Sequence, residues 1–95
     1  MPDVLDGDAV DAALADRGIA WSREGSDLVK VVRRTGFAGA LEFVNQVGAL
    51  AETADHHPDV DIRWDTVTLR LSTHSAGGLT EMDFTMAARF DQLGG

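Results

Sequence analysis

Cysteine is absent from this chain of 95 residues. The protein can therefore form no disulfide and no thiolate metal site, and it has no cysteine nucleophile. Two prolines and ten glycines are too few for a collagen-like or disordered chain, while 44% hydrophobic and 25% charged residues are typical of a globular protein. We expect residues 1–95 to form one domain. Because so short a chain buries only about two-thirds of its unfolded surface, association with another copy is also expected.

Positive charge and long apolar runs are scarce as well. Sixteen acidic residues outnumber eight basic ones, for a formal net charge of −8, and Arg33-Arg34 is the only adjacent basic pair. Nucleic acids and anionic membranes both require clustered positive charge, so we exclude them as main partners. No run approaches the roughly 18 apolar residues of a membrane span, and the acidic first eleven residues do not resemble an export signal. We expect a cytoplasmic protein.

Apolar spacing predicts three helices. Asp8 is a candidate cap for the first, which Gly18 stops. The second follows Thr35 and ends at or before His57, because Pro58 disfavours helical geometry in the residue that precedes it. Its apolar stripe comprises Phe37, Leu41, Val44, Val47, Ala51 and Ala54. The third begins with a capping-box pattern formed by Thr80 and Asp83. Its apolar face comprises Met82, Met86, Phe90 and Leu93, which follow helical spacing.

Two hairpins separate these helices. The first pairs residues 19–23 with 28–34, and its second strand is apolar on both faces, so its outer face is a candidate contact for a second copy. The second turns at Asp65-Thr66, which places Trp64 opposite Val67 on the side of the core. The order α-β-β-α-β-β-α predicts an α+β fold in which three helices pack on one face of a four-stranded antiparallel sheet.

All three histidines fall at the ends of predicted elements. His56 and His57 lie where the second helix meets the third strand, and His74 follows the fourth strand. Antiparallel pairing of the last two strands brings Pro58 close to residues 71–73, so His74 should lie beside the histidine pair.

Two carboxylates complete the predicted cluster. Asp83 follows His74 after a short loop, and Glu52 lies one helical turn before His56. Imidazoles give and take protons near neutral pH, and carboxylates fix their orientation. The cluster favours lyase or isomerase chemistry.

Other interpretations of these residues stay open. Histidines and acids at element ends are, taken singly, most often solvated loop residues. A zinc site is less favoured than a metal-free one, because adjacent histidines rarely both point inward. Ser72 or Ser75 could complete a Ser-His-Asp set, although the nucleophile-elbow pattern is missing. Gly77-Gly78 could cradle a phosphate, but without a P-loop lysine it is more often a turn.

The candidate residues follow a distinctive spacing. It reads Glu52, three residues, His56-His57-Pro58, five residues, Trp64, nine residues, His74, eight residues, Asp83. This spacing resembles the signature of the pterin-4a-carbinolamine dehydratase family, and the predicted element order agrees with that of the family. Val60 departs from the tryptophan that many animal members carry at its position.

The resemblance implies an activity: loss of water from a 4a-hydroxytetrahydropterin to give the quinonoid dihydropterin. It implies no metal and no organic cofactor, and it links the protein to tetrahydropterin recycling after an aromatic amino-acid hydroxylase. His56 and His74 would form the acid/base pair, and His57 would bind and orient the pterin. An acidic surface would not repel such a substrate, because the pterin ring carries no phosphate.

The resemblance implies supporting roles for further residues. Asp83, at a helix N-terminus that favours its ionised form, would accept hydrogen bonds from the substrate or orient a histidine. Glu52 would support the region of His56, and Pro58 would shape the corner beside it. Contacts from the strand beside the ligand would come from the backbone of Ser72 and Thr73.

Some relatives on this fold act through protein contacts instead, as a dimerisation cofactor of a transcription factor or as assembly factors for a carbon-fixing enzyme. Those roles need surfaces and not histidines, so the gathered imidazoles favour catalysis. Relatives form dimers or tetramers, and we therefore expect a homodimer or homotetramer.

Overall fold

The computed structural model describes residues 3–94, so Met1, Pro2 and Gly95 of the predicted domain lie outside the described residues. The elements are α1 (Gly7–Arg17), β1 (Ser22–Glu24), β2 (Asp27–Arg33), α2 (Gly36–Ala54), β3 (Asp59–Arg63), β4 (Thr66–Leu71) and α3 (Glu81–Asp91). One sheet has the strand order β1-β2-β4-β3, with every neighbouring pair antiparallel. The predicted α+β fold is confirmed.

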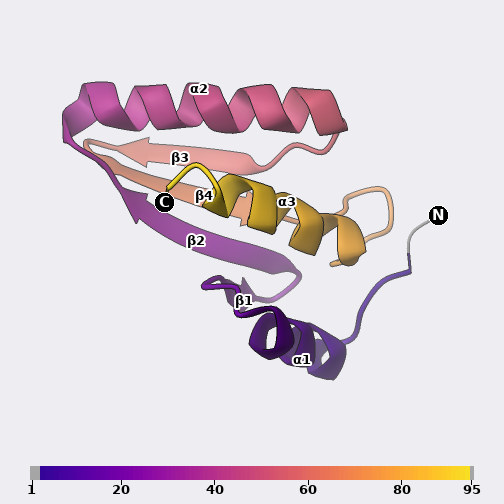
Figure 1. Cartoon of the computed structure of the whole chain (residues 1–95). Helices are drawn as coiled ribbons and strands as arrows, with labels where there is room; N and C mark the ends of the chain where they lie inside the picture. Colours follow the sequence, from indigo (N-terminus) through magenta and orange to yellow (C-terminus); the bar gives the residue numbers. More distant parts are fainter. Residues whose placement is uncertain (1–2, 95) are drawn as a thin grey trace.

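The helices lie on one side of the sheet, with α2 and α3 across it and α1 beside β1 (Figure 1). Alternate residues of β4 face these helices and are fully buried, namely Val67, Leu69 and Leu71. A single apolar cluster joins them to all three helices; its helical members include Val10, Phe43, Val47, Phe84 and Phe90. Over residues 3–94, no helix combines the length and apolar character needed to cross a bilayer.

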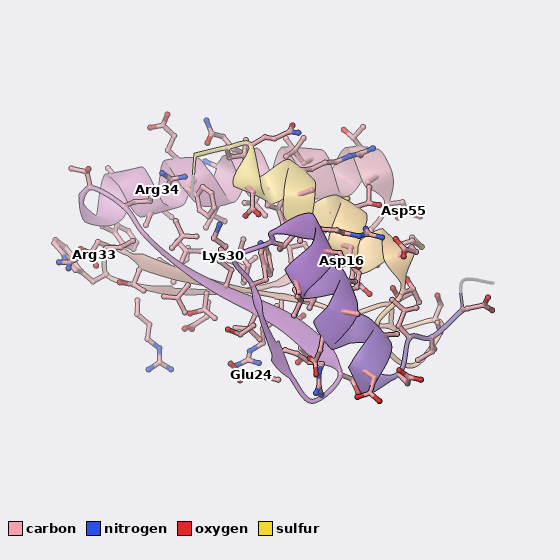
Figure 2. All side chains as sticks on the ribbon, turned by 60° about the horizontal axis from the view of Figure 1, so that its bottom comes forward. Asp16, Glu24, Lys30, Arg33, Arg34 and Asp55 are labelled. Atoms are coloured by element: carbon pink, nitrogen blue, oxygen red, sulfur yellow. The ribbon has the colours of Figure 1, made fainter. Side chains whose placement is uncertain are left out.

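A polar contact fixes the end of α3 to the sheet. Lys30, labelled in Figure 2, lies in the middle of β2. Its Nζ donates to Asp91 Oδ1 at 2.6 Å, and the same oxygen accepts a hydrogen bond from Trp21 Nε1 at 2.9 Å. Trp21 was expected within the first strand, but β1 begins one residue later. Its ring is instead buried, 6.4 Å from the ring of Phe90.

The helix ends match the sequence patterns in part. Asp6, and not Asp8, caps α1, because its side chain accepts a hydrogen bond from the N–H of Ala9. Gly18 ends α1 as predicted, with φ 62°. The capping box of α3 is confirmed, and α2 ends before His57 as predicted.

The predicted apolar stripe of α2 was wrong at its first turns. Phe37 and Leu41 are 48% and 41% exposed, whereas Val47 and Ala51 farther along the helix are buried. Ala40 and Phe43, in the same turns as Phe37 and Leu41, are buried instead. Apolar spacing therefore identified the helix correctly, but it did not show which side of its first turns faces the core.

The turn of the second hairpin lies one residue earlier than predicted. Arg63 pairs with Thr66, so Trp64 and Asp65 form the turn. Trp64 adopts a left-handed backbone (φ 56°) and is 70% exposed, which contradicts its predicted place on the core side.

Contacts from the end of β2 explain this position of the turn. Arg33 Nε donates to Asp65 Oδ2 at 2.9 Å, and the Arg34 N–H donates to the Asp65 carbonyl at 2.8 Å. The hydrogen bond from Arg33 lowers the pKa of Asp65 from its ordinary value of 3.8.

This ion pair predicts a pH-dependent contribution to stability. A carboxyl whose pKa is lowered by folding stabilises the native state above its unfolded pKa and loses that effect as the pH falls through the folded pKa. Asp65→Asn should therefore lower the free energy of unfolding at pH 7, and the difference from the wild type should shrink as the pH falls below 3.8. Urea denaturation at a series of pH values measures this difference. Asp16→Asn, at an exposed aspartate of α1, is the control and should not reproduce the trend. If the stability difference between Asp65→Asn and the wild type stays constant down to about pH 2, the lowered pKa of Asp65 does not contribute to stability.

Candidate active site

The end of α2 sets the position of His56. Asp55 adopts a left-handed backbone (φ 51°), which aspartate tolerates better than most residues. The Asp55 N–H donates to the Glu52 carbonyl at 3.3 Å, and the His56 N–H donates to the Ala51 carbonyl at 3.1 Å, as in a Schellman helix end. The chain turns back here and leaves His56 only 7% exposed.

A buried carboxylate holds the ring of His56. Asp83, in the first turn of α3, is fully buried, and its Oδ1 lies 2.7 Å from His56 Nε2. Its Oδ2 accepts hydrogen bonds from the Thr73 hydroxyl at 2.8 Å and from the Thr80 backbone N–H at 3.0 Å. The hydroxyl oxygens of Thr73 and Thr80 are 2.7 Å apart, so all four residues form one buried network. Asp83 can orient His56 from this position, but its burial keeps a ligand out of reach.

A tight loop after β4 carries His74. The Thr73 carbonyl accepts hydrogen bonds from the N–H groups of Ala76 and Gly77, both at 3.0 Å, and Thr73 pairs with Gly78 in an isolated antiparallel bridge. The two glycines thus belong to a turn, in which Gly77 has φ 78°. His74 is exposed on this loop, and within residues 3–94 its imidazole has no hydrogen-bond partner.

Within the region of His56, Glu52 contacts the neighbouring histidine. Its Oε2 lies 2.5 Å from Nε2 of His57, whereas Nε2 of His56 pairs with Asp83. Both side chains of this pair are exposed, Glu52 by 78% and His57 by 54%. The reason lies in the helix end: the left-handed residue Asp55 turns His56 inward and leaves its neighbour outside.

The three histidines surround one hollow of 300 Å³. This volume lies at the lower limit of small-molecule sites, which range from about 300 to 1,000 Å³.

The hollow lies where the end of α2, the start of β3, the loop after β4 and the start of α3 meet. Asp55 marks this place in Figure 2, at the end of the molecule opposite Arg33 and Arg34. Its lining residues are Asp55, His56, His57, Pro58, Asp59, Ser72, Thr73, His74, Ser75 and Met82. Of the sequence-predicted residues, only Glu52 and Asp83 do not line it.

Several members of the site were not identified as such from the sequence. Thr80 was recognised only as a helix cap, and Met82 only as an apolar helix residue. The sequence did contain a signal for Thr80. Its capping-box partner is Asp83, which was already a candidate site residue, so the Thr80 hydroxyl had to lie close to that carboxylate.

The alternative chemistries find little geometric support. In the described part of the chain, neither Ser72 nor Ser75 hydrogen-bonds a histidine, so a Ser-His-Asp set is not assembled. Among the same residues, no group of three or more histidine and carboxylate side chains is arranged to hold a metal ion.

Several described proteins are similar to this chain over most of its length. Residues 3–93 match the family described as “Pterin 4 alpha carbinolamine dehydratase”. The “Putative pterin-4-alpha-carbinolamine dehydratase” of Roseiflexus castenholzii is 52% identical over 73 residues, which are 77% of this chain and 78% of that protein. A protein of the same name from Mycobacterium sp. (strain KMS) is 48% identical over 90 residues, 95% of each chain.

Two solved structures share the fold. A “transcriptional coactivator/pterin dehydratase” from Brucella melitensis matches with a TM-score of 0.88 and 28% identity, over 98% of this chain and all of that one. A “pterin dehydratase-like protein”, described as a RuBisCO assembly factor in the alpha-carboxysome, matches with a TM-score of 0.64 and 25% identity, over 79% of this chain and 87% of that one. Sequence, fold and residue spacing agree, and this chain belongs to the pterin 4 alpha carbinolamine dehydratase family.

Proposed function

We propose that this protein is a dehydratase that removes water from a 4a-hydroxytetrahydropterin by histidine acid/base catalysis. The observation that carries the proposal is the hollow itself, which is lined by three imidazoles, one of them fixed by a buried carboxylate. Family membership gives the reaction class, and the geometry supplies groups suited to it.

The reaction needs one acid and one base. The C4a hydroxyl is a poor leaving group until a proton converts it to water. As the C4a–O bond breaks, the N5–H bond gives up its proton and its electron pair forms the N5=C4a double bond. The products are water and the quinonoid dihydropterin, and the enzyme ends with the proton count that it began with.

The histidines differ in ways that suit these roles. We assign the acid/base pair to His56 and His74. His56 is held rigidly by Asp83, whereas His74 is exposed on the loop after β4 and free to meet a substrate atom. His57, paired with Glu52 at the outer rim, would bind and orient the pterin ring.

The remaining site residues would shape the pocket. Pro58 follows the His56-His57 pair and fixes the corner between α2 and β3. Ser72 and Thr73 line the hollow directly after β4, where their backbone groups would contact the ligand. No metal or organic cofactor has a part in this scheme.

The wider roles are part of the same proposal. The reaction would serve tetrahydropterin recycling next to an aromatic amino-acid hydroxylase, in the cytoplasm. A protein-assembly role is the alternative, and it is favoured by one observation: solved structures of the same fold are described as a coactivator and as an assembly factor.

The central experiment measures dehydration of a chemically prepared 4a-hydroxytetrahydropterin with and without purified protein. His56→Ala and His74→Ala should each lower kcat by about 100-fold or more, because each removes a proton-transfer group. Asn45→Ala, at an exposed position of α2 outside the hollow, is the control and should keep wild-type kcat. Equal rates with and without wild-type protein would end the enzyme assignment.

Ligand-induced stabilisation separates the enzyme from a pure assembly factor. A pterin that binds only the folded protein should raise its melting temperature as the ligand concentration increases. At 100 times Kd, the free energy of unfolding should increase by about 2.7 kcal/mol. Differential scanning fluorimetry with a stable tetrahydropterin or dihydropterin tests this. A melting temperature that does not respond to millimolar pterin would favour the assembly role.

We also propose that the protein is a homodimer or homotetramer. Val31, on the outer face of β2, is 61% exposed, and Phe37 and Leu41 expose apolar surface on α2. Light scattering at micromolar concentration should give two or four times the chain mass of 10.2 kDa. A mass equal to that of one chain would contradict this.

A further inference from the structure

The hydroxyl groups beside Asp83 can point in only one direction. An ionised carboxylate accepts hydrogen bonds and donates none, so the Thr73 hydroxyl donates to Asp83 Oδ2. This uses the one hydrogen of Thr73, and the 2.7 Å contact between the two threonines must therefore be donated by Thr80. Thr80 Oγ1 in turn accepts from the backbone N–H of Met82. The result is a chain of donors that runs from α3 through both threonines into the carboxylate.

Two features favour the ionised form of Asp83. The Thr80 backbone N–H, which can only donate, lies 3.0 Å from Oδ2. The carboxylate also lies in the first turn of α3, where the partial positive charge of a helix N-terminus stabilises an anion.

The ionised carboxylate decides which nitrogen of His56 is reactive. Asp83 Oδ1 accepts, so His56 Nε2 must carry a hydrogen. In the neutral ring the lone pair is then on Nδ1, and only Nδ1 can exchange a proton with a molecule in the hollow.

We propose that Thr73 is a positioning residue which acts through Asp83 on His56: it fixes Nδ1 as the exchanging nitrogen and lowers the pH at which the pair of Asp83 and His56 takes up a proton. The catalytic consequence rests on the proposed dehydratase function, whereas the effect on the ring does not.

The sign of the effect follows from charge. Before it takes up a proton, the pair carries one negative charge, and afterwards it is neutral overall. A hydroxyl that donates to the carboxylate stabilises the negative state more than the neutral one. Removing that hydroxyl therefore raises the proton affinity of the pair, and the pair titrates at higher pH.

The other charged groups near the pair are the same in every Thr73 variant. The hollow contributes groups from the end of α2, from β3 and from the loop after β4, and a second hollow beside His56, between α2 and α3, contributes two more. None of these groups hydrogen-bonds Thr73, so their effect on the titration of His56 should cancel between Thr73 variants. The groups are Asp55, His57, Asp59 and His74 at the first hollow, Glu52 through its contact with His57, and Glu81 and Arg89 at the second hollow.

The test compares three substitutions of threonine in the full-length protein. Thr73→Val removes the hydroxyl at nearly constant volume, and Thr73→Ser keeps it. Thr68→Val is the matched control, because it makes the same change within β4, on the outer face of the sheet and away from Asp83, where Thr68 pairs with Val31 and Asp61. Nitrogen-15 NMR of the His56 ring reports the tautomer and the titration midpoint, and the pH profile of kcat/KM reports the catalytic effect.

The wild type should keep its proton on His56 Nε2 and titrate at Nδ1. Thr73→Val should raise the His56 midpoint by about 0.5 to 1 pH unit, and the limb of the pH profile that belongs to His56 should move by the same amount, a change of about threefold to tenfold in kcat/KM on that limb. Thr73→Ser should return both to wild-type values, and Thr68→Val should leave both unchanged. A loss of packing alone would lower the melting temperature without moving the midpoint.

Two results would overturn the proposal. One is a neutral wild-type ring with its hydrogen on Nδ1, a measurement that needs no variant and so still decides if Thr73→Val does not fold. The other is a folded Thr73→Val protein with the wild-type midpoint. A wild type without dehydratase activity would instead reject the proposed function, and the NMR titration would still test the role of Thr73.

Discussion

The buried carboxylate of Asp83 is the constraint on which the rest of the site depends. It accepts hydrogen bonds from His56 in the segment between α2 and β3, from Thr73 in the loop after β4, and from Thr80 at the N-terminus of α3. A charge without exposure to water is tolerated only when hydrogen bonds replace its hydration, so these three segments must meet for the chain to fold with Asp83 inside. The same meeting of segments forms the hollow. The contacts that bury Asp83 therefore also bring together the segments that line the hollow.

This constraint separates the histidines into two kinds. His56 is fixed, with one nitrogen committed to Asp83, while His57 and His74 are exposed at the rim. A fixed ring costs little reorganisation when a substrate arrives, and the exposed rings can adjust to it. One rigid and two exposed imidazoles would suit the proposed substrate, a small and flat heterocycle that has to bind and leave.

The hollow and the most exposed apolar side chains of α2 lie at opposite ends of that helix. The hollow lies where α2 ends, whereas the exposed side chains of Phe37 and Leu41 belong to its first turns. The two ends of α2 lie at opposite ends of the sheet (Figure 1). A surface contact at the start of α2 would leave the hollow open.

The sequence by itself determined what depends on a few neighbouring residues: the stop at Gly18, the capping box at Thr80, the alternation in β4 and hence the element order. It also singled out the histidines, through their spacing. Only the tertiary structure decided that Trp64 is exposed and that Asp83 is buried against His56, 27 residues away. Local patterns state which backbone conformation a segment prefers, but a buried contact depends on how distant segments close around it. That closure, and not the spacing, selects the partner of each polar group.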